Sequence, residues 1–146
     1  MFKVTDTLFS KIPTAFGLGQ DSTTFTRGHL VYHDTSTGTL KEASSSVGLV
    51  TNIVGIVNKT QTTTTGQYIQ YTPVITGAVF VTADCTNATA ANQLWKQQVL
   101  TDAGTINNSS TTTSTTAGVF MPTALVGAST ANQLYGYFIR IGQVDA

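Results

Sequence analysis

The chain has 146 residues and no net charge, and only 10% of its residues are Asp, Glu, Lys or Arg, where about 25% is usual. Its seven Lys and Arg residues are scattered singly, so the sequence lacks the basic cluster that a nucleic-acid-binding protein uses against phosphates. The single Cys85 excludes a framework of internal disulfides. A chain of this length predicts one domain that needs no covalent or metal staple.

The residue types favour strands throughout. There are 29 threonines, and Val and Ile are also frequent, whereas residues with high helix propensity are sparse. β-branched side chains fit the pleated surface of a sheet better than a helix. Glycines and short polar clusters recur along the chain in the rhythm of an all-β protein. The sequence therefore predicts an all-β fold, a single β-barrel or a tulip-like or sandwich-like domain.

Residues 1–24 differ from the rest of the chain because neither a helical nor a strand period fits them. We expect them to form an extended N-terminal arm that precedes an all-β domain at residues 25–146. The apolar residues of the arm stand apart among polar ones, and they are Phe2, Leu8, Phe9, Ile12 and Phe16. Exposed aromatic rings cost solubility, so the arm is expected to dock on its own neighbours or on a partner. Lys3 interrupts the first apolar positions, and the sequence predicts no signal peptide.

Strands are expected in the remaining sequence at residues 25–33, 39–43, 47–57, 67–72 and 77–82, and in a final strand that includes residues 135–141. Residues 47–57 are apolar at almost every position, which indicates a central strand covered on both faces. The final strand alternates strictly, with Tyr135 and Tyr137 on one face and Phe138 on the other. One internal echo, between residues 88–95 and residues 128–135, suggests two similar β-units.

A search for chemistry finds no predicted catalytic residue, metal site or cofactor site. His29 and His33 are four apart, but on an extended strand that spacing is about 13 Å, too far for two ligands of one metal ion. Cys85 has no basic neighbour in the sequence and reads as a small packing residue. Gly17-Leu-Gly19 lacks the third glycine of a dinucleotide-binding loop. We therefore expect a non-enzymatic protein.

Six short segments resemble the decoration (cement) proteins of tailed-bacteriophage capsids. They are Arg27–Tyr32, Ile53–Val57, Gly66–Tyr71, Gly77–Val81, Leu125–Ala128 and Phe138–Ile141. The resemblance covers about residues 25–146. It implies a homotrimer made in the host cytoplasm, which binds the major capsid protein on the outer surface of the phage head and stabilises that lattice. It also implies that the N-terminal arm would reach onto the capsid. From the scattered Lys and Arg residues and the lack of a long apolar segment, we expect no nucleic-acid or membrane partner.

Two other functions remain open from the residues. A tail-fibre or head-fibre module that binds a carbohydrate or receptor would use exposed aromatic rings, for which Trp95, Tyr68, Tyr71 and Tyr135 are candidates. An ice-binding sheet would need a regular ladder of threonines, whereas the threonines of residues 62–65 and 111–116 lie in consecutive runs. Consecutive residues of a strand point to opposite faces, so these runs favour loops over an ice-binding surface.

Overall fold

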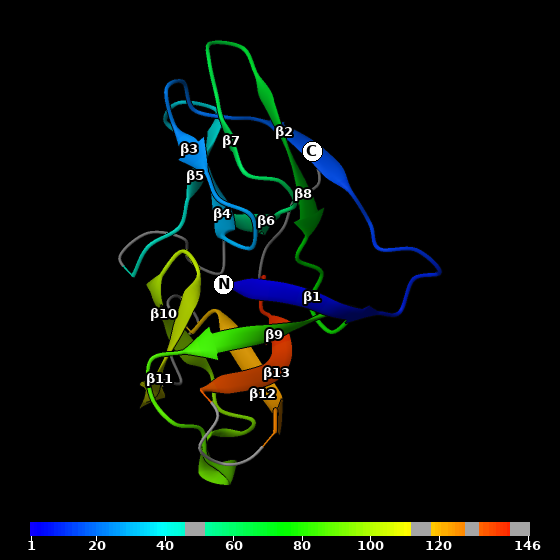
Figure 1. Cartoon of the computed structure of the whole chain (residues 1–146), viewed down its shortest axis with the longest axis vertical. Coiled ribbons are helices and arrows are strands. Elements are labelled where there is room, and N and C mark those ends of the chain that lie inside the picture. The colour runs from blue at the N-terminus through cyan, green and yellow to red at the C-terminus, as the bar shows by residue number, and fades with distance from the viewer. Residues whose placement is uncertain (46–51, 112–117, 128–131, 141–146) are drawn as a thin grey trace.

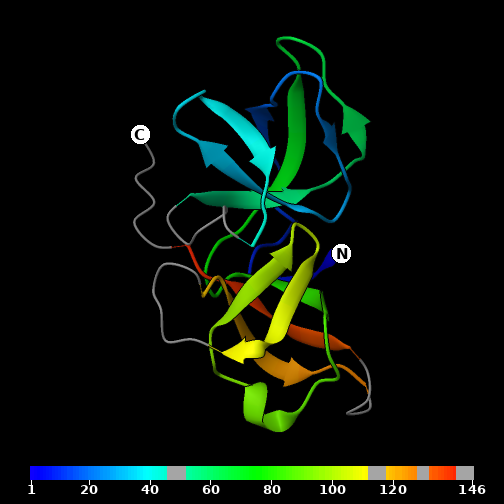
Figure 2. The same cartoon turned by 90° about the vertical axis from the view of Figure 1, so that its left-hand side faces the viewer.

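The computed structural model describes residues 1–45, 52–111, 118–127 and 132–140. The described residues form strands, turns and a single short 3-10 helix, η1 (Ala91–Gln93), which confirms the all-β prediction. Four predicted features lie partly outside the described residues: the strand at 47–57, the threonine run at 111–116, the second of the two similar segments at 128–135, and the end of the final strand. The strands form two barrels, one above the other in Figures 1 and 2.

The C-terminal barrel consists of β9 (Val79–Cys85), β10 (Gln98–Asp102), β11 (Thr105–Thr111), β12 (Phe120–Leu125) and β13 (Gln133–Phe138). Its strands follow the order β9-β11-β10-β12-β13, and β13 pairs back onto β9. This last pairing closes the sheet into a five-stranded ring.

The N-terminal barrel consists of β2 (Ala15–Leu18), β4 (Leu30–Asp34), β5 (Thr39–Glu42), β6 (Ile53–Val57) and β8 (Tyr68–Pro73). Their order in the sheet is β2-β8-β6-β4-β5. A parallel bridge between Gly19 and Leu40 joins the two end strands, so this sheet also closes on itself. A two-stranded ribbon of β3 (Thr24–Phe25) and β7 (Gln61–Thr62) accompanies it.

The two barrels share one strand order and one set of strand directions. In each, the first and last strands are antiparallel neighbours: β2 pairs with β8 and β9 pairs with β13. In each, the first strand is parallel to the third, through the bridge of Gly19 to Leu40 in one barrel and the pair of Cys85 with Ile106 in the other. The barrel architecture expected from the sequence therefore occurs twice in the chain.

The echo that the sequence suggested is not the structural repeat. Gln93 of the first copy is the last residue of η1, whereas its counterpart Gln133 in the second copy is the first residue of β13. The sequence Asn-Gln-Leu thus takes two conformations. The second copy pairs with β9 and β12, whereas the first copy ends at Trp95, whose backbone lies in the left-handed region at φ 61°. The similar β-units are the two barrels instead.

Strand β1 (Phe2–Thr7) lies between the two barrels and pairs antiparallel with β9. A bulge interrupts the pairing between Val4 and Asp6. The predicted arm of residues 1–24 is thus paired with the rest of the chain along β1 and again along β2. Between these two strands, residues 8–14 form a loop at the side of the molecule (Figure 1).

Most of the predicted strands have observed counterparts. The expected strands at 39–43, 67–72 and 77–82 are β5, β8 and β9, and β6 is buried along its whole length, as a central strand requires. The strand expected at 25–33 is divided into β3 and β4. The division occurs at Gly28, whose φ of +83° takes the chain out of the extended conformation that a continuous strand needs.

Candidate interaction surface

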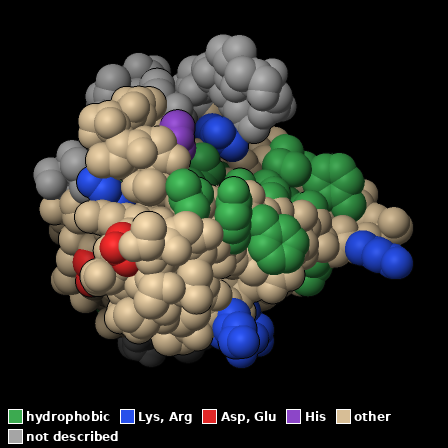
Figure 3. Space-filling model, turned by 90° about the horizontal axis from the view of Figure 1, so that it is seen from above, with side chains coloured by type: hydrophobic (Ala, Val, Ile, Leu, Met, Phe, Trp, Pro, Cys, Tyr) green, Lys and Arg blue, Asp and Glu red, His purple; other side chains and the backbone are tan. Residues whose placement is uncertain are grey.

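Four exposed apolar side chains stand together in sequence on the β1–β2 loop and on β2. Leu8 is 75% exposed, Phe9 46%, Ile12 54% and Phe16 67%. Apolar side chains of this part of the molecule appear as a green area in Figure 3. We call these four residues the apolar surface. Exposed apolar groups that gather on one face mark interaction sites more often than scattered ones do.

Local hydrogen bonds hold the start of the loop. The main-chain N–H of Leu8 donates to the carbonyl of Ala78 at 2.9 Å, which ties the loop to the beginning of β9. The hydroxyl of Thr7 accepts a hydrogen bond from the main chain of Phe9 at 3.1 Å. These contacts use only the main chain of Leu8 and Phe9, and they leave the side chains of both residues exposed.

Phe16 is exposed because of strand alternation in β2. The next residue, Gly17, faces the interior, where a Cβ would lie only 2.3 Å from the side chain of Leu40. Since neighbouring residues of a strand point to opposite faces, Phe16 faces outward. Tyr68 on the paired strand β8 lies opposite Leu18 and is 62% exposed. The sequence predicted a strand at residues 67–72, but it did not place Tyr68 on the same surface as Phe16.

Phe2 does not belong to this surface, which corrects its assignment as a contact residue. It is 2% exposed, and its ring packs edge to face on that of Phe138 with the centroids 4.9 Å apart. The physical reason is the pairing of β1 with β9, which places Phe2 opposite Ala83 and turns its ring into the core. The sequence signal was the alternation of Phe2 and Val4 with Lys3, which is too short to identify a strand alone.

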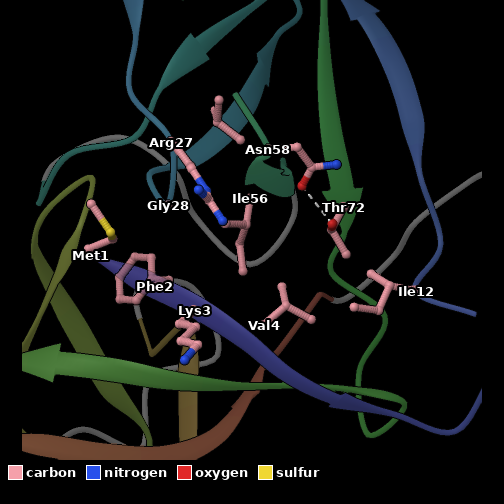
Figure 4. Close-up of a pocket in the computed structure, with 11 residues that line it drawn as sticks. Met1, Phe2, Lys3, Val4, Ile12, Arg27, Gly28, Ile56, Asn58 and Thr72 are labelled. Atoms are coloured by element: carbon pink, nitrogen blue, oxygen red, sulfur yellow. Dashed lines mark hydrogen bonds between the residues drawn. The ribbon is translucent and has the colours of Figure 1, made fainter. Parts of the chain in front are cut away.

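A groove of about 570 Å³ lies between β1 and the N-terminal barrel (Figure 4). Val4 and Ile12 line it on the side of β1 and its loop, and Ile56 and Thr72 line it on the side of the barrel. Ile12 also belongs to the apolar surface, so the groove and that surface are continuous. Volumes of this size are typical of ligand pockets.

The two histidines do not form a metal site. His29 precedes β4, and its Nδ1 lies 2.9 Å from Oε2 of Glu42, whose other oxygen accepts the main-chain N–H of Thr26 at 2.6 Å. His33 is exposed on β4. Within the described part of the chain, no three His, Cys, Asp or Glu side chains gather as metal ligands would.

Cys85 is buried at the end of β9 and has no disulfide partner. Burial, assisted by the negative charge of Asp84, raises the pKa of its thiol to about 12. Since the thiolate is the reactive form, this environment suits a packing role. The neighbouring carboxyl of Asp84 behaves differently: burial opposes its ionisation, but hydrogen bonds from Gln133 and the chain's amino group keep its pKa below the ordinary value.

The four candidate sugar-stacking rings lie in different environments. Trp95 is 66% exposed and Tyr68 is 62% exposed. Tyr71 is half-buried against the core of the N-terminal barrel. Tyr135 stacks on Phe80, with 5.6 Å between the centroids and 5° between the planes. Trp95 belongs to the C-terminal barrel and Tyr68 to the other, so the four rings do not form one platform.

Comparison with known proteins found no match: no family model, no curated protein and no solved structure matches the chain. No helix among the described residues has the length and apolar character needed to cross a bilayer.

Proposed function

We propose that this chain is a non-enzymatic structural protein that attaches to a larger assembly through its apolar surface. The observation that carries the proposal is the exposure of Leu8, Phe9 and Ile12 on a loop whose backbone is tied to β9. Large apolar side chains can enter pockets of a partner, and the hydrogen bonds at the main chain of Leu8 and Phe9 lower the cost of ordering the start of the loop. The low charge of the chain is consistent with a surface covered by other subunits.

The assembly that we propose is the head of a tailed bacteriophage. In this proposal, homotrimers of the chain bind the major capsid protein on the outer surface of the head and act as a decoration (cement) protein. A protein that binds the mature lattice better than other states stabilises it by mass action. Many copies on a symmetric shell multiply the effect. No catalytic step, cofactor, membrane or nucleic acid takes part.

The proposal is tested by binding of purified protein to purified heads that lack it. A triple variant with Leu8→Ser, Phe9→Ser and Ile12→Ser is expected to fold and to lose attachment in a sedimentation assay. Deletion of residues 1–20 is a poor test, because it removes β1, β2 and the buried Phe2. Full occupancy by the folded triple variant would contradict the proposal.

High salt and a control variant test whether attachment depends on the apolar surface. Binding through apolar groups persists at 1 M salt, where charge–charge attraction is screened beyond about 3 Å. Trp95→Asn removes a ring that is 66% exposed beside the C-terminal barrel, away from the apolar surface. Asn accepts the left-handed backbone conformation of this position. This control is expected to bind heads normally.

A second function, recognition of a glycan or receptor by a fibre module, is favoured by Trp95 alone. Its ring is exposed although its backbone has φ 61°, and its main-chain N–H donates to the carbonyl of Pro122 at 2.8 Å. Backbone conformations of this kind in non-glycine residues cluster at functional sites. A glycan array supports this function if the wild type binds a defined sugar and Trp95→Asn does not.

A further inference from the structure

The groove between β1 and the N-terminal barrel has an open strand edge along one wall. Strand β1 is the terminal strand of its sheet, and all its strand pairing is with β9. On its other edge the main-chain N–H of Phe2 donates to the carbonyl of Gly28 at 2.7 Å. Groups two residues apart on a strand point to the same edge, so the N–H and C=O of Val4 also face the barrel.

The main-chain groups of Val4 are not used by the described residues. The hydrogen bond from Phe2 to Gly28 joins β1 to the N-terminal barrel at one end of the groove. From Lys3 onward, no hydrogen bond joins this edge of β1 to the described residues of that barrel. Unpaired N–H and C=O groups on a strand edge are a template for an added strand. When such an edge lines a groove, main-chain hydrogen bonds supply affinity and the groove walls select side chains.

The charge of the groove indicates which peptide it fits. Lys3 and Arg27 both line it, and no Asp or Glu is among its described lining residues. Neither cation makes an ion pair with a described carboxylate. In Figure 4 the side chain of Arg27 extends from the N-terminal barrel toward β1. Two cations with no counter-charge are complementary to an anionic group of a ligand.

Other side chains that line the groove are apolar or are hydrogen-bonded to each other. Val4, Ile12 and Ile56 offer hydrocarbon surface, and the hydroxyl of Thr72 donates to Oδ1 of Asn58 at 2.8 Å (Figure 4). Side chains of an added strand alternate between two faces. A segment with apolar residues at every second position and a carboxylate between them would therefore meet both the hydrocarbon walls and the cations.

We propose that this groove binds an extended, acidic segment of a partner protein, which adds as a strand to the free edge of β1. Its main chain bonds to the N–H and C=O of Val4, and its carboxylate pairs with Arg27. Ile12 lines this groove and also belongs to the apolar surface. The two proposals are separated by Arg27, which lines the groove but is not part of the apolar surface, so either can fail without the other.

The experiment selects peptides from a displayed library of random octapeptides on the full-length protein. The selected peptides are expected to combine Asp or Glu with alternating apolar residues. Their affinity, measured by fluorescence anisotropy, should fall about tenfold in Arg27→Gln, the loss of one charge-assisted hydrogen bond. Arg27→Lys should keep most of the affinity, and Lys59→Gln, an exposed control outside the groove, should keep all of it.

Strand addition is tested separately on the peptide, which avoids any change to the fold. Only alternate residues of an added strand bond to the edge, so N-methylation of one alternate set should abolish binding and methylation of the other set should not. Val4→Pro removes the N–H donor of the strand edge and should also abolish binding. An unfolding temperature equal to that of the wild type shows that the loss is not caused by misfolding.

Three results of the peptide experiment would overturn the inference. They are a selection that yields no binding peptide, selected peptides without acidic residues, and affinities unchanged in Arg27→Gln. Self-association of the wild type that Arg27→Gln abolishes would assign the groove to a second copy of the chain and would also overturn it.

Discussion

The rings of Phe2 and Phe138 pack edge to face, with 4.9 Å between their centroids and an interplanar angle of 78°. The pair joins the first strand of the chain to the last one described, because both strands flank β9. The ring of Phe120 adds a third member, 5.3 Å from that of Phe138. The core of the C-terminal barrel thus depends on the N-terminal residues.

Phe2→Ala is expected to lower the free energy of unfolding by about 3–5 kcal/mol, as loss of a buried phenylalanine ring does. Phe9→Ala, at an exposed position, is the matched control and should change it by less than about 0.5 kcal/mol. Urea titration followed by far-ultraviolet circular dichroism measures both. Equal effects of the two variants would place Phe2 outside the core.

A buried amide supports the segment before η1. Asn108 is 1% exposed; its Oδ1 accepts the main-chain N–H of Asn87 at 2.9 Å, and its Nδ2 donates to the carbonyl of Asn87 at 2.9 Å. Asn108→Ala leaves these main-chain groups without partners and should destabilise the protein by about 1–3 kcal/mol.

The control for this prediction is Asn107→Ala, one position away. The Asn107 side chain bonds only to Ser109 among the described residues, so its loss should cost much less. Thermal unfolding of the two variants separates them, and an Asn107 variant as unstable as that of Asn108 would contradict the account.

The hairpin of β4 and β5 makes stability depend on pH. Asp34 pairs with Lys41 and accepts hydrogen bonds from the hydroxyl and main chain of Ser36, and these contacts hold the pKa of its carboxyl well below the ordinary value. A lowered folded-state pKa stabilises the fold above the unfolded pKa of about 3.9. That stabilisation is lost as the pH falls below this value toward the folded pKa.

The midpoint of thermal unfolding of the wild type should therefore decrease from pH 5 to pH 2. In Asp34→Asn the contribution of this carboxyl is absent, so the variant should be less stable than the wild type at pH 5 and the difference should narrow at pH 2. A difference that does not change with pH would show that the Asp34 charge contributes nothing.

Cys85 should resist alkylation in the native protein. Its thiol has a pKa of about 12 and is 6% exposed, so both the thiolate fraction and the access of a reagent are low. Iodoacetamide at pH 8 should label the folded chain far more slowly than the chain in 6 M guanidinium chloride, as mass spectrometry would show. Equal labelling rates would contradict the buried environment.

The sequence predicted those strands that have a clear local pattern of apolar residues. Residues 53–57 are continuously apolar, and they form the fully buried β6. Strand β1 was not predicted, because only Phe2 and Val4 alternate before Asp6 and its partner β9 is far away in the sequence. Pairing between distant segments has no local signature, so the duplication of the barrel was also missed.

For the candidate sites too, the sequence predicted the features that depend on neighbouring residues and missed those that depend on distant ones. Leu8, Phe9, Ile12 and Phe16 were predicted as contact residues from their unusual spacing, and all four are exposed. The groove could not be predicted, since it combines the free edge of β1 with Arg27 and Ile56 from another part of the chain. Only the folded arrangement shows that Lys3 and Arg27 line one groove and that no described Asp or Glu lines it with them.

The central proposal, that the chain is a structural protein on the outer surface of a phage head, is tested most directly by its copy number in purified phage particles. Quantitative mass spectrometry compares the chain with the major capsid protein of the same particles. The account predicts a copy number of the same order as that of the shell subunit. Absence of the chain from the particles, or only the few copies of a tail appendage, would contradict it.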